Sequence, residues 1–177
     1  HRRIGKIKGT MFYNRYESEE DMEVNKDIVI MSEGYDRIDG RNAYHSNIKR
    51  LTLGMPVMEK NKNMQIAMQI WEEKEDGTLS IAMELPIHQI MDFMLFLSRT
   101  MLYFREAYRY PLLYKPDNPV IERIGVQGGV MPVNICIDNP DIDNDIKKFS
   151  QALSDLGELT GERMRTLSHI FEEMECY

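Results

Sequence analysis

The longest apolar stretch of the chain runs from Ile87 to Tyr108 and directly follows Pro86. Its middle, Phe93–Leu97, places apolar residues on every side of a helix, which is typical of a helix buried in a core. Polar residues at positions 92 and 98–100 interrupt the run well before the roughly 20 apolar residues that a membrane-spanning helix needs. The pattern therefore predicts a long, buried, central helix in a soluble domain that has no membrane partner.

Two segments before this helix alternate between apolar and other residues. In Met64–Trp71 and in Thr78–Leu85, every second residue is a methionine, isoleucine or leucine. Period-two alternation on both sides of the turn residues 75–77 predicts an antiparallel hairpin with one buried apolar face. Pro86 ends the second strand and begins the helix, where a missing N–H has no cost. We expect the apolar face of the hairpin to pack against the long helix.

Other segments complete the predicted fold. Ile28–Met31, Val120–Val126 and Val130–Ile137 are candidate strands, and the last two are separated by a glycine-containing turn. Apolar residues at three- and four-residue spacing predict two C-terminal amphipathic helices, one around Phe149 and one around Leu167. The sequence thus predicts an α+β fold, with a small, mainly antiparallel sheet packed on one long buried helix. Residues 1–27, basic at first and then acidic, predict a peripheral arm before a single domain at 28–177.

Composition argues against a nucleic-acid partner and against a disulfide-stabilised or cysteine-ligated metal protein. The formal net charge of −7 disfavours a nucleic-acid polymer as the partner, because binding phosphates requires a basic surface. Two cysteines, Cys136 and Cys176, form no disulfide framework or metal-binding spacing, and no secretory signal is recognisable. We therefore expect a reduced, cytoplasmic setting.

The acidic stretch Asp138–Asp145 suggests calcium, but the spacing argues against it. An EF-hand loop that begins at Asp141 would place Ile146 at the glycine position and Ala152 at the bidentate glutamate position. Pro140 near a helix start, followed by acids in the first turn, fits the beginning of a helix better. The scattered histidines form no zinc motif, and the chain has no P-loop, so we predict no metal and no cofactor.

One polar line follows the long helix. His88, Asp92, Arg99 and Glu106 lie within about 40° of one another on the helical wheel. On a solvent-facing side this would be an ordinary polar stripe. In a cavity, Asp92 would orient His88 as a general base and Arg99 would stabilise an anion.

Two further clusters suggest a ligand. The 34–46 loop is rich in turn residues and hydrogen-bonding groups, and the helix ends in alternating aromatic and basic residues. Arginine binds phosphate or carboxylate in bidentate fashion, and aromatic rings stack on planar groups. A structural turn in the loop, and local pairing of the arginines with acids, are the alternatives.

The preferred hypothesis is a non-enzymatic protein that senses or sequesters a small anionic, nucleotide-like ligand. Its pocket would lie between the 34–46 loop and one face of the long helix. One alternative is a metal-independent hydrolase whose base is His88–Asp92 or His45–Asp39. Another is a protein–protein interaction module without a pocket, and a homo-oligomer formed by the C-terminal helices or the arm is also open. The candidate ligand-binding residues are Tyr35, Arg41, Asn42, His45, His88, Asp92, Arg99, Tyr103 and Arg109.

The stretches GYDRIDGRNAYHS, LPIHQIMD and RTMLYFREAYR resemble an uncharacterised bacterial domain family. The resemblance covers roughly Ile28 to Arg109. It implies that the three stretches belong to one unit, and it assigns no activity and no functional residue.

Overall fold

The structure, a computed structural model, describes residues 27–32, 34–39, 47–58 and 65–175. The chain divides into two compact units, His1–Ile90 and Met91–Tyr177, and each is described by itself. The predicted arm lies almost wholly outside the described residues. The prediction of a single domain over 28–177 stays a prediction.

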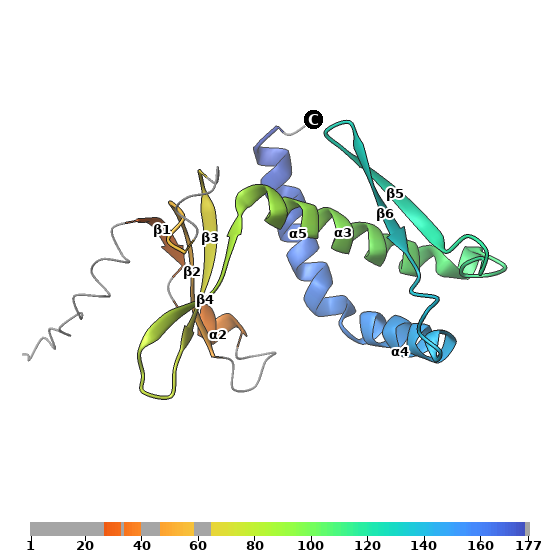
Figure 1. Ribbon diagram of the computed structural model, residues 1–177, viewed down its shortest axis with the longest axis horizontal. Coiled ribbons are helices and arrows are strands. Elements are labelled where there is room, and N and C mark those ends of the chain that lie inside the picture. The colour runs from red at the N-terminus through yellow and green to blue at the C-terminus, as the bar shows by residue number, and fades with distance from the viewer. Residues whose placement is uncertain (1–26, 33, 40–46, 59–64, 176–177) are drawn as a thin grey trace, which may run out of the picture. The chain divides into compact units, whose positions relative to one another are not determined.

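The N-terminal unit contains a four-stranded antiparallel sheet in the order β1-β2-β3-β4 (Figure 1). Its strands are β1 (Ile28–Ser32), β2 (Ile48–Gly54), β3 (Ala67–Glu73) and β4 (Leu79–Pro86), with the short helix α2 (Tyr35–Asp39) between β1 and β2. The predicted β3–β4 hairpin is confirmed. Its turn carries Gly77 at a φ of +82°, and the Asp76 carboxylate accepts hydrogen bonds from the Thr78 amide and hydroxyl.

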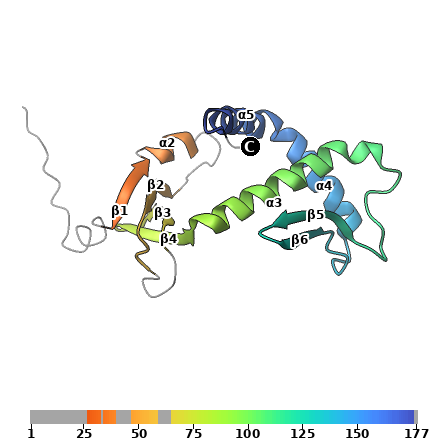
Figure 2. The same ribbon diagram turned by 90° about the horizontal axis from the view of Figure 1, so that it is seen from above.

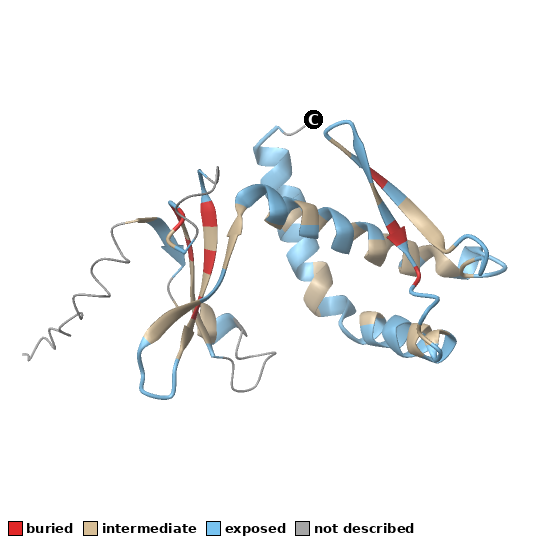
Figure 3. Ribbon diagram, in the orientation of Figure 1, coloured by how far each residue is buried: buried red, intermediate tan, exposed pale blue. Residues whose placement is uncertain are grey.

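The buried face of this sheet is the reverse of the predicted one. Ala67, Gln69 and Trp71 are buried, whereas Met68 and Ile70 on the opposite face of β3 are only partly covered. Figure 3 shows the buried positions alternating along β3. Polar groups can be buried when they are hydrogen-bonded, so a glutamine can occupy an interior position if partners surround it. The prediction that the methionine–isoleucine face is buried is therefore wrong.

The long helix α3 (Ile87–Glu106) follows β4 directly and continues into a short 3₁₀ turn, η1 (Ala107–Arg109), which confirms the predicted element. Its predicted burial is wrong, because none of its residues is buried (Figure 3). The helix carries its own apolar side chains on all sides. Residues between 164 and 172 lie beside Met94 and Ser98, and the Phe149 ring packs on Phe104, so only part of the helix surface is covered.

The C-terminal unit contains a hairpin and two helices beside α3. The strands β5 (Val120–Val126) and β6 (Gly129–Asn134) pair antiparallel across a two-residue turn, in which Gln127 and Gly128 have φ of +49° and +78°. Positive φ at both positions is typical of a type I′ hairpin turn. The helices α4 (Ile142–Asp155) and α5 (Gly157–Glu173) follow, joined at Leu156 (Figure 2). These elements confirm the predicted strands and C-terminal helices.

Together the elements define an α+β protein, as predicted. The packing of the sheet on the long helix stays a prediction. No helix in the described part of the chain is long and apolar enough to cross a membrane.

Candidate functional site

The structure separates the predicted ligand-binding residues into three groups. Arg41, Asn42 and His45 lie outside the described residues. Tyr35 begins α2 in the N-terminal unit and is partly buried. The remaining candidates follow α3 and its 3₁₀ extension: His88, Asp92, Arg99, Tyr103 and Arg109.

The residues of the polar line on α3 are not joined to one another by hydrogen bonds or ion pairs in the described part of the chain. Within the described residues, no hydrogen bond or ion pair joins His88 to Asp92, and His88 is exposed. The Arg99 guanidinium lies 4.0 Å from the Glu122 carboxylate of β5, at the outer limit of an ion pair, and about half of its side chain is exposed. This geometry agrees with an ordinary polar stripe that faces solvent. The hydrolase alternative is left as a prediction.

The aromatic end of α3 is satisfied by its own neighbours. The Tyr103 ring stacks on Tyr110 with centroids 5.3 Å apart, and its hydroxyl donates to the carbonyl oxygen of Leu113. Burial, followed by the nearby Tyr110 and Glu122, raises the pKa of Tyr103. Phe104 meets Phe149 of α4 edge to face at 5.0 Å. Tyr103 thus holds the connection after α3 in place.

Arg109 also has local partners. Its guanidinium lies 3.5 Å from the Glu106 carboxylate and 5.5 Å from the centre of the Tyr108 ring, and its Nε donates to the Tyr108 hydroxyl at 3.1 Å. This is the local pairing that the sequence left open as an alternative. Such exposed pairs contribute little to stability, typically about 0–1 kcal/mol.

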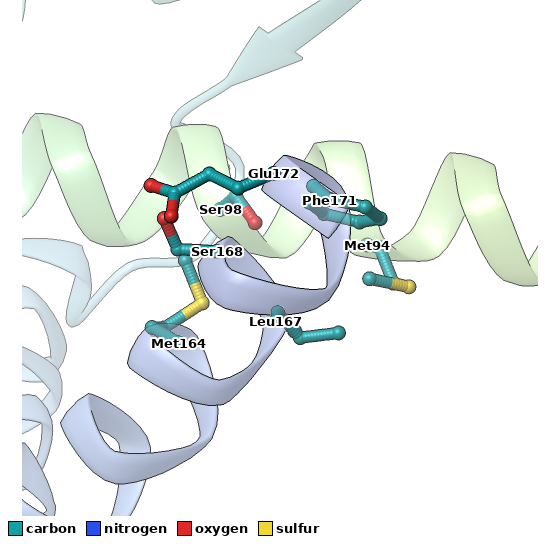
Figure 4. A pocket seen from close by; sticks show the side chains of 7 residues that line it. All are labelled: Met94, Ser98, Met164, Leu167, Ser168, Phe171 and Glu172. Carbon is teal, nitrogen blue, oxygen red and sulfur yellow. The ribbon is translucent and has the colours of Figure 1, made fainter. Parts of the chain in front are cut away.

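A groove on the surface of the C-terminal unit lies between α3 and α5 (Figure 4). Its volume is about 300 Å³. Four apolar side chains form most of its lining, and two serines and a glutamate complete it. The residues are Met94 and Ser98 of α3, and Met164, Leu167, Ser168, Phe171 and Glu172 of α5. We call this feature the α3–α5 groove.

The sequence predicts α5 as an amphipathic helix but does not reveal this groove. The periodicity gave the correct side of the helix but not its exposure. Met164, Ile170 and Phe171 of α5 are exposed, as is Met174 directly after it. Isolated exposed apolar residues are ordinary on proteins, whereas a contiguous set marks an interaction surface.

A second hollow, of about 490 Å³, lies at the acidic turn of the N-terminal unit. It is lined by Asn47 and the consecutive residues 72–76. Nearby, the Lys49 ammonium lies 3.1 Å from Glu73 and 3.4 Å from Asp36, and the hydrogen bond to Glu73 is the main cause of the raised pKa of Lys49. No group of three potential metal ligands exists among the residues that the structure describes.

The sheet contains a polar network that the sequence did not reveal. The Trp71 indole donates to the Thr52 hydroxyl at 2.8 Å, and that hydroxyl donates to the Gln69 side-chain oxygen at 2.7 Å. The Gln69 amide nitrogen donates to the Met55 carbonyl and to the Glu84 carboxylate. We call these side chains the sheet network: Thr52, Gln69, Trp71 and Glu84.

Glu84 extends the network to the segment after β2. Its two carboxylate oxygens accept hydrogen bonds from the Val57 and Met58 amides at 2.7 and 2.9 Å. The segment is thereby tied to β4, and the network has a structural role. The one hint in the sequence was a glutamine beside alanine and tryptophan on the less apolar side of the hairpin.

The acidic stretch before α4 is occupied by its own hydrogen bonds. The Asn139 amide donates to Asp145 at 2.9 Å, its oxygen accepts from the Asp141 amide, and Asn144 donates to Asp141. The hydrogen bond from Asn139, followed by that from Lys148, lowers the pKa of Asp145. Asp143 and Asp145 lie in the first turn of α4, where acids favour the helix dipole. This arrangement is the predicted helix start.

The comparisons with known proteins place the chain in a family. A model of a family of unknown function, DUF6530, matches residues 19–177. The chain belongs to this family, which confirms the resemblance to an uncharacterised family and extends it to the C-terminal helices. No curated protein and no solved structure matches the chain.

Proposed function

We propose that the protein is a non-enzymatic interaction module and that its α3–α5 groove binds an amphipathic helix of a partner protein. The observation that carries this proposal is the apolar lining of an open groove between two helices. The removal of exposed apolar area from water is the main driving force of protein association. A partner would cover what the groove leaves exposed.

The composition of the groove suits a protein side chain better than a small anion. Met94 and Met164 are flexible and polarizable, and methionine is over-represented at surfaces that accept varied apolar partners. No arginine or lysine lines the groove. Ile170 of α5 and Met174, which directly follows α5, are further exposed apolar residues of this segment. An elongated apolar surface of this kind fits helix-in-groove recognition.

The charge at one end of the groove specifies the partner further. Glu172 lines the groove, Glu173 follows it, and the last turn of α5 carries no basic residue. The C-terminal end of a helix also bears a partial negative charge. A partner helix with lysine or arginine beside its apolar stripe therefore complements this end, whereas an acidic helix is disfavoured.

Fluorescently labelled peptides test this proposal. The panel consists of an amphipathic helix with leucine and phenylalanine on one face and lysine flanks, the same helix with glutamate flanks, and a scrambled lysine peptide. Fluorescence anisotropy should show the lysine-flanked helix binding most tightly. Leu167→Glu should weaken binding by about tenfold or more, which corresponds to about 1.4 kcal/mol.

Thr166→Glu provides a matched control, because residue 166 lies about 160° from Met164 on the helical wheel. It adds the same charge to α5 away from the groove and should leave binding unchanged. Equal binding of all three peptides, or binding that Leu167→Glu does not weaken, would rule out recognition by the groove.

The anion and hydrolase hypotheses are tested in parallel by thermal shift. A panel of mono-, di- and cyclic nucleotides is added to the full chain, and products are sought by chromatography. A rise in melting temperature that Arg99→Met abolishes would favour the anion hypothesis over the groove. Product formation that is lost in His88→Ala would favour the hydrolase.

A further inference from the structure

A second apolar surface lies on α3, away from the α3–α5 groove. Phe93, Phe96 and Leu97 are 57%, 47% and 54% exposed. Their three- and four-residue spacing places them on one side of the helix. On the helical wheel this side lies about 130° from the side of Met94 and Ser98, which face the groove. We call these three residues the α3 stripe.

Two opposite charges flank the α3 stripe on the same edge. Asp92 and Arg99 are seven residues apart, so their directions differ by only about 20° on the helical wheel. Along the helix axis they are about 10 Å apart, which is too far for a direct ion pair within the chain. In the described part of the chain, Asp92 forms no ion pair, and Arg99 has only the 4.0 Å contact with Glu122.

This charge pattern is complementary to itself. A two-fold axis placed level with the midpoint between Leu95 and Phe96 lies equally far from residues 92 and 99. An antiparallel helix related by that axis would therefore bring Asp92 opposite Arg99 of the partner subunit, and would do so twice. Symmetric dimers use one patch on both subunits in this manner.

We propose that the protein forms a symmetric dimer in which the α3 stripes of two copies pack antiparallel, with Asp92 paired to Arg99 of the partner subunit at both ends of the crossing. A second copy fits the stripe because the stripe and its charges match their own two-fold image. A partner of single charge would leave either Asp92 or Arg99 opposite a like charge.

The dimer should be weak. Phe104, nearer the C-terminal end of α3, is already covered by Phe149 of α4, so the second copy crosses α3 over residues 92–100 only. Two phenylalanines and a leucine, each about half exposed, bury much less than the about 800 Å² per partner of a standard interface. Association should therefore depend on protein concentration in the micromolar range or above.

Sedimentation equilibrium of the full chain, over a dilution series, measures this association. The average mass should rise from monomer towards dimer with concentration. Asp92→Arg and Arg99→Asp should each shift the protein to monomer, because each places like charges opposite one another. The double variant Asp92→Arg/Arg99→Asp should restore the dimer, because the swapped charges again match across the two-fold axis.

Lys74→Glu, a charge change in the exposed β3–β4 turn, is the control and should leave association unchanged. Far-UV circular dichroism establishes that each variant is folded. If Arg99→Asp fails to fold because its new carboxylate would face Glu122, Asp92→Arg carries the test by itself. A monomer at every concentration, a dimer that Asp92→Arg leaves intact, or two folded single variants without rescue by the double variant would each overturn the proposal.

Discussion

The interior of the sheet and the surface of α3 differ in the polarity of the residues that they bury and expose. In the N-terminal unit, Gln69 and Thr52 are buried polar residues, and each is hydrogen-bonded to groups on neighbouring strands. In the C-terminal unit, α3 is largely apolar but contains no buried residue. The sheet therefore contains polar groups where apolar ones are usual, and the helix exposes apolar groups where polar ones are usual.

This difference suggests that the sheet network serves stability and that the exposed sides of α3 serve association. A hydrogen-bonded interior fixes one strand register, because any shift would leave buried donors and acceptors without partners. An exposed apolar helix gains no stability from its exposure, and the two proposals above assign its exposed sides to partners. On this comparison, changes in the sheet network should affect folding, whereas changes on the exposed sides of α3 should mainly affect association.

The largest expected effect contrasts a buried and an exposed apolar residue of the C-terminal unit. Ile124 of β5 is 6% exposed, and Leu95 of α3 is 40% exposed. Ile124→Ala should lower the free energy of unfolding by about 2–5 kcal/mol. Leu95→Ala should lower it by about 1 kcal/mol or less, as is usual for exposed sites. Urea denaturation of both variants measures the difference, and equal losses would show that α3 is as buried as β5.

A smaller loss is expected from the sheet network. Gln69→Leu retains the approximate size of the side chain but removes the acceptor for the Thr52 hydroxyl and the side-chain donor to the Met55 carbonyl. We expect a loss of about 2 kcal/mol, within the range for a buried polar group that has lost its partner.

Gln151→Leu, on the exposed surface of α4, is the matched control and should change stability by about 0.5 kcal/mol or less. Trp71 is the only tryptophan of the chain and belongs to the network, so its fluorescence reports the unfolding of this region. A neutral Gln69→Leu would mean that the network adds no stability.

A still smaller effect is expected before α4, where polar groups satisfy one another as they do in the sheet. The pKa of Asp145 is lowered from its ordinary 3.8 by the hydrogen bond from Asn139. A carboxyl whose pKa is lower in the folded state contributes stability above its unfolded pKa and loses it as the pH falls through its folded pKa. Wild-type stability should thus fall more steeply with acid than that of Asn139→Ala, in urea melts from about pH 5 to about pH 2.

The smallest expected effect is none. Added calcium should leave the melting temperature unchanged, because Asn139, Asp141 and Asp145 bind one another and Asn144. An ion that bound only the native state would raise the melting temperature. A calcium-dependent rise in a thermal melt would therefore contradict the interpretation of this stretch as a helix start.

Sequence periodicity predicted the elements well. Alternation located β3 and β4, the apolar run located α3, and three- and four-residue spacing located α4 and α5. Each of these patterns follows from the side-chain directions of a strand or a helix, which repeat every two or 3.6 residues, so one sequence suffices to recognise them.

The buried face of the sheet and the α3–α5 groove could not be predicted in the same manner. Gln69 is buried because Thr52 and Glu84, 17 and 15 residues away, provide its partners, and alternation within β3 contains no information about them. The groove beside α5 was not predicted, because periodicity identifies an apolar side of a helix but not what covers it. The predicted anion site was placed between the 34–46 loop and α3 on the basis of their composition alone. Its residues 41, 42 and 45 lie outside the described residues.

The type I′ turn at Gln127–Gly128 has a consequence for the order in which the chain folds. It joins β5 and β6 through the shortest hairpin loop, so Ile124 and its register partner Met131 come together after closure of a very short segment of chain. Such hairpins form within about 1–10 μs. The sheet network instead links Thr52 to Gln69 across a longer connection, and contacts of larger sequence separation form more slowly. In a refolding experiment, we therefore expect the β5–β6 hairpin to acquire structure before Trp71 reaches its final environment.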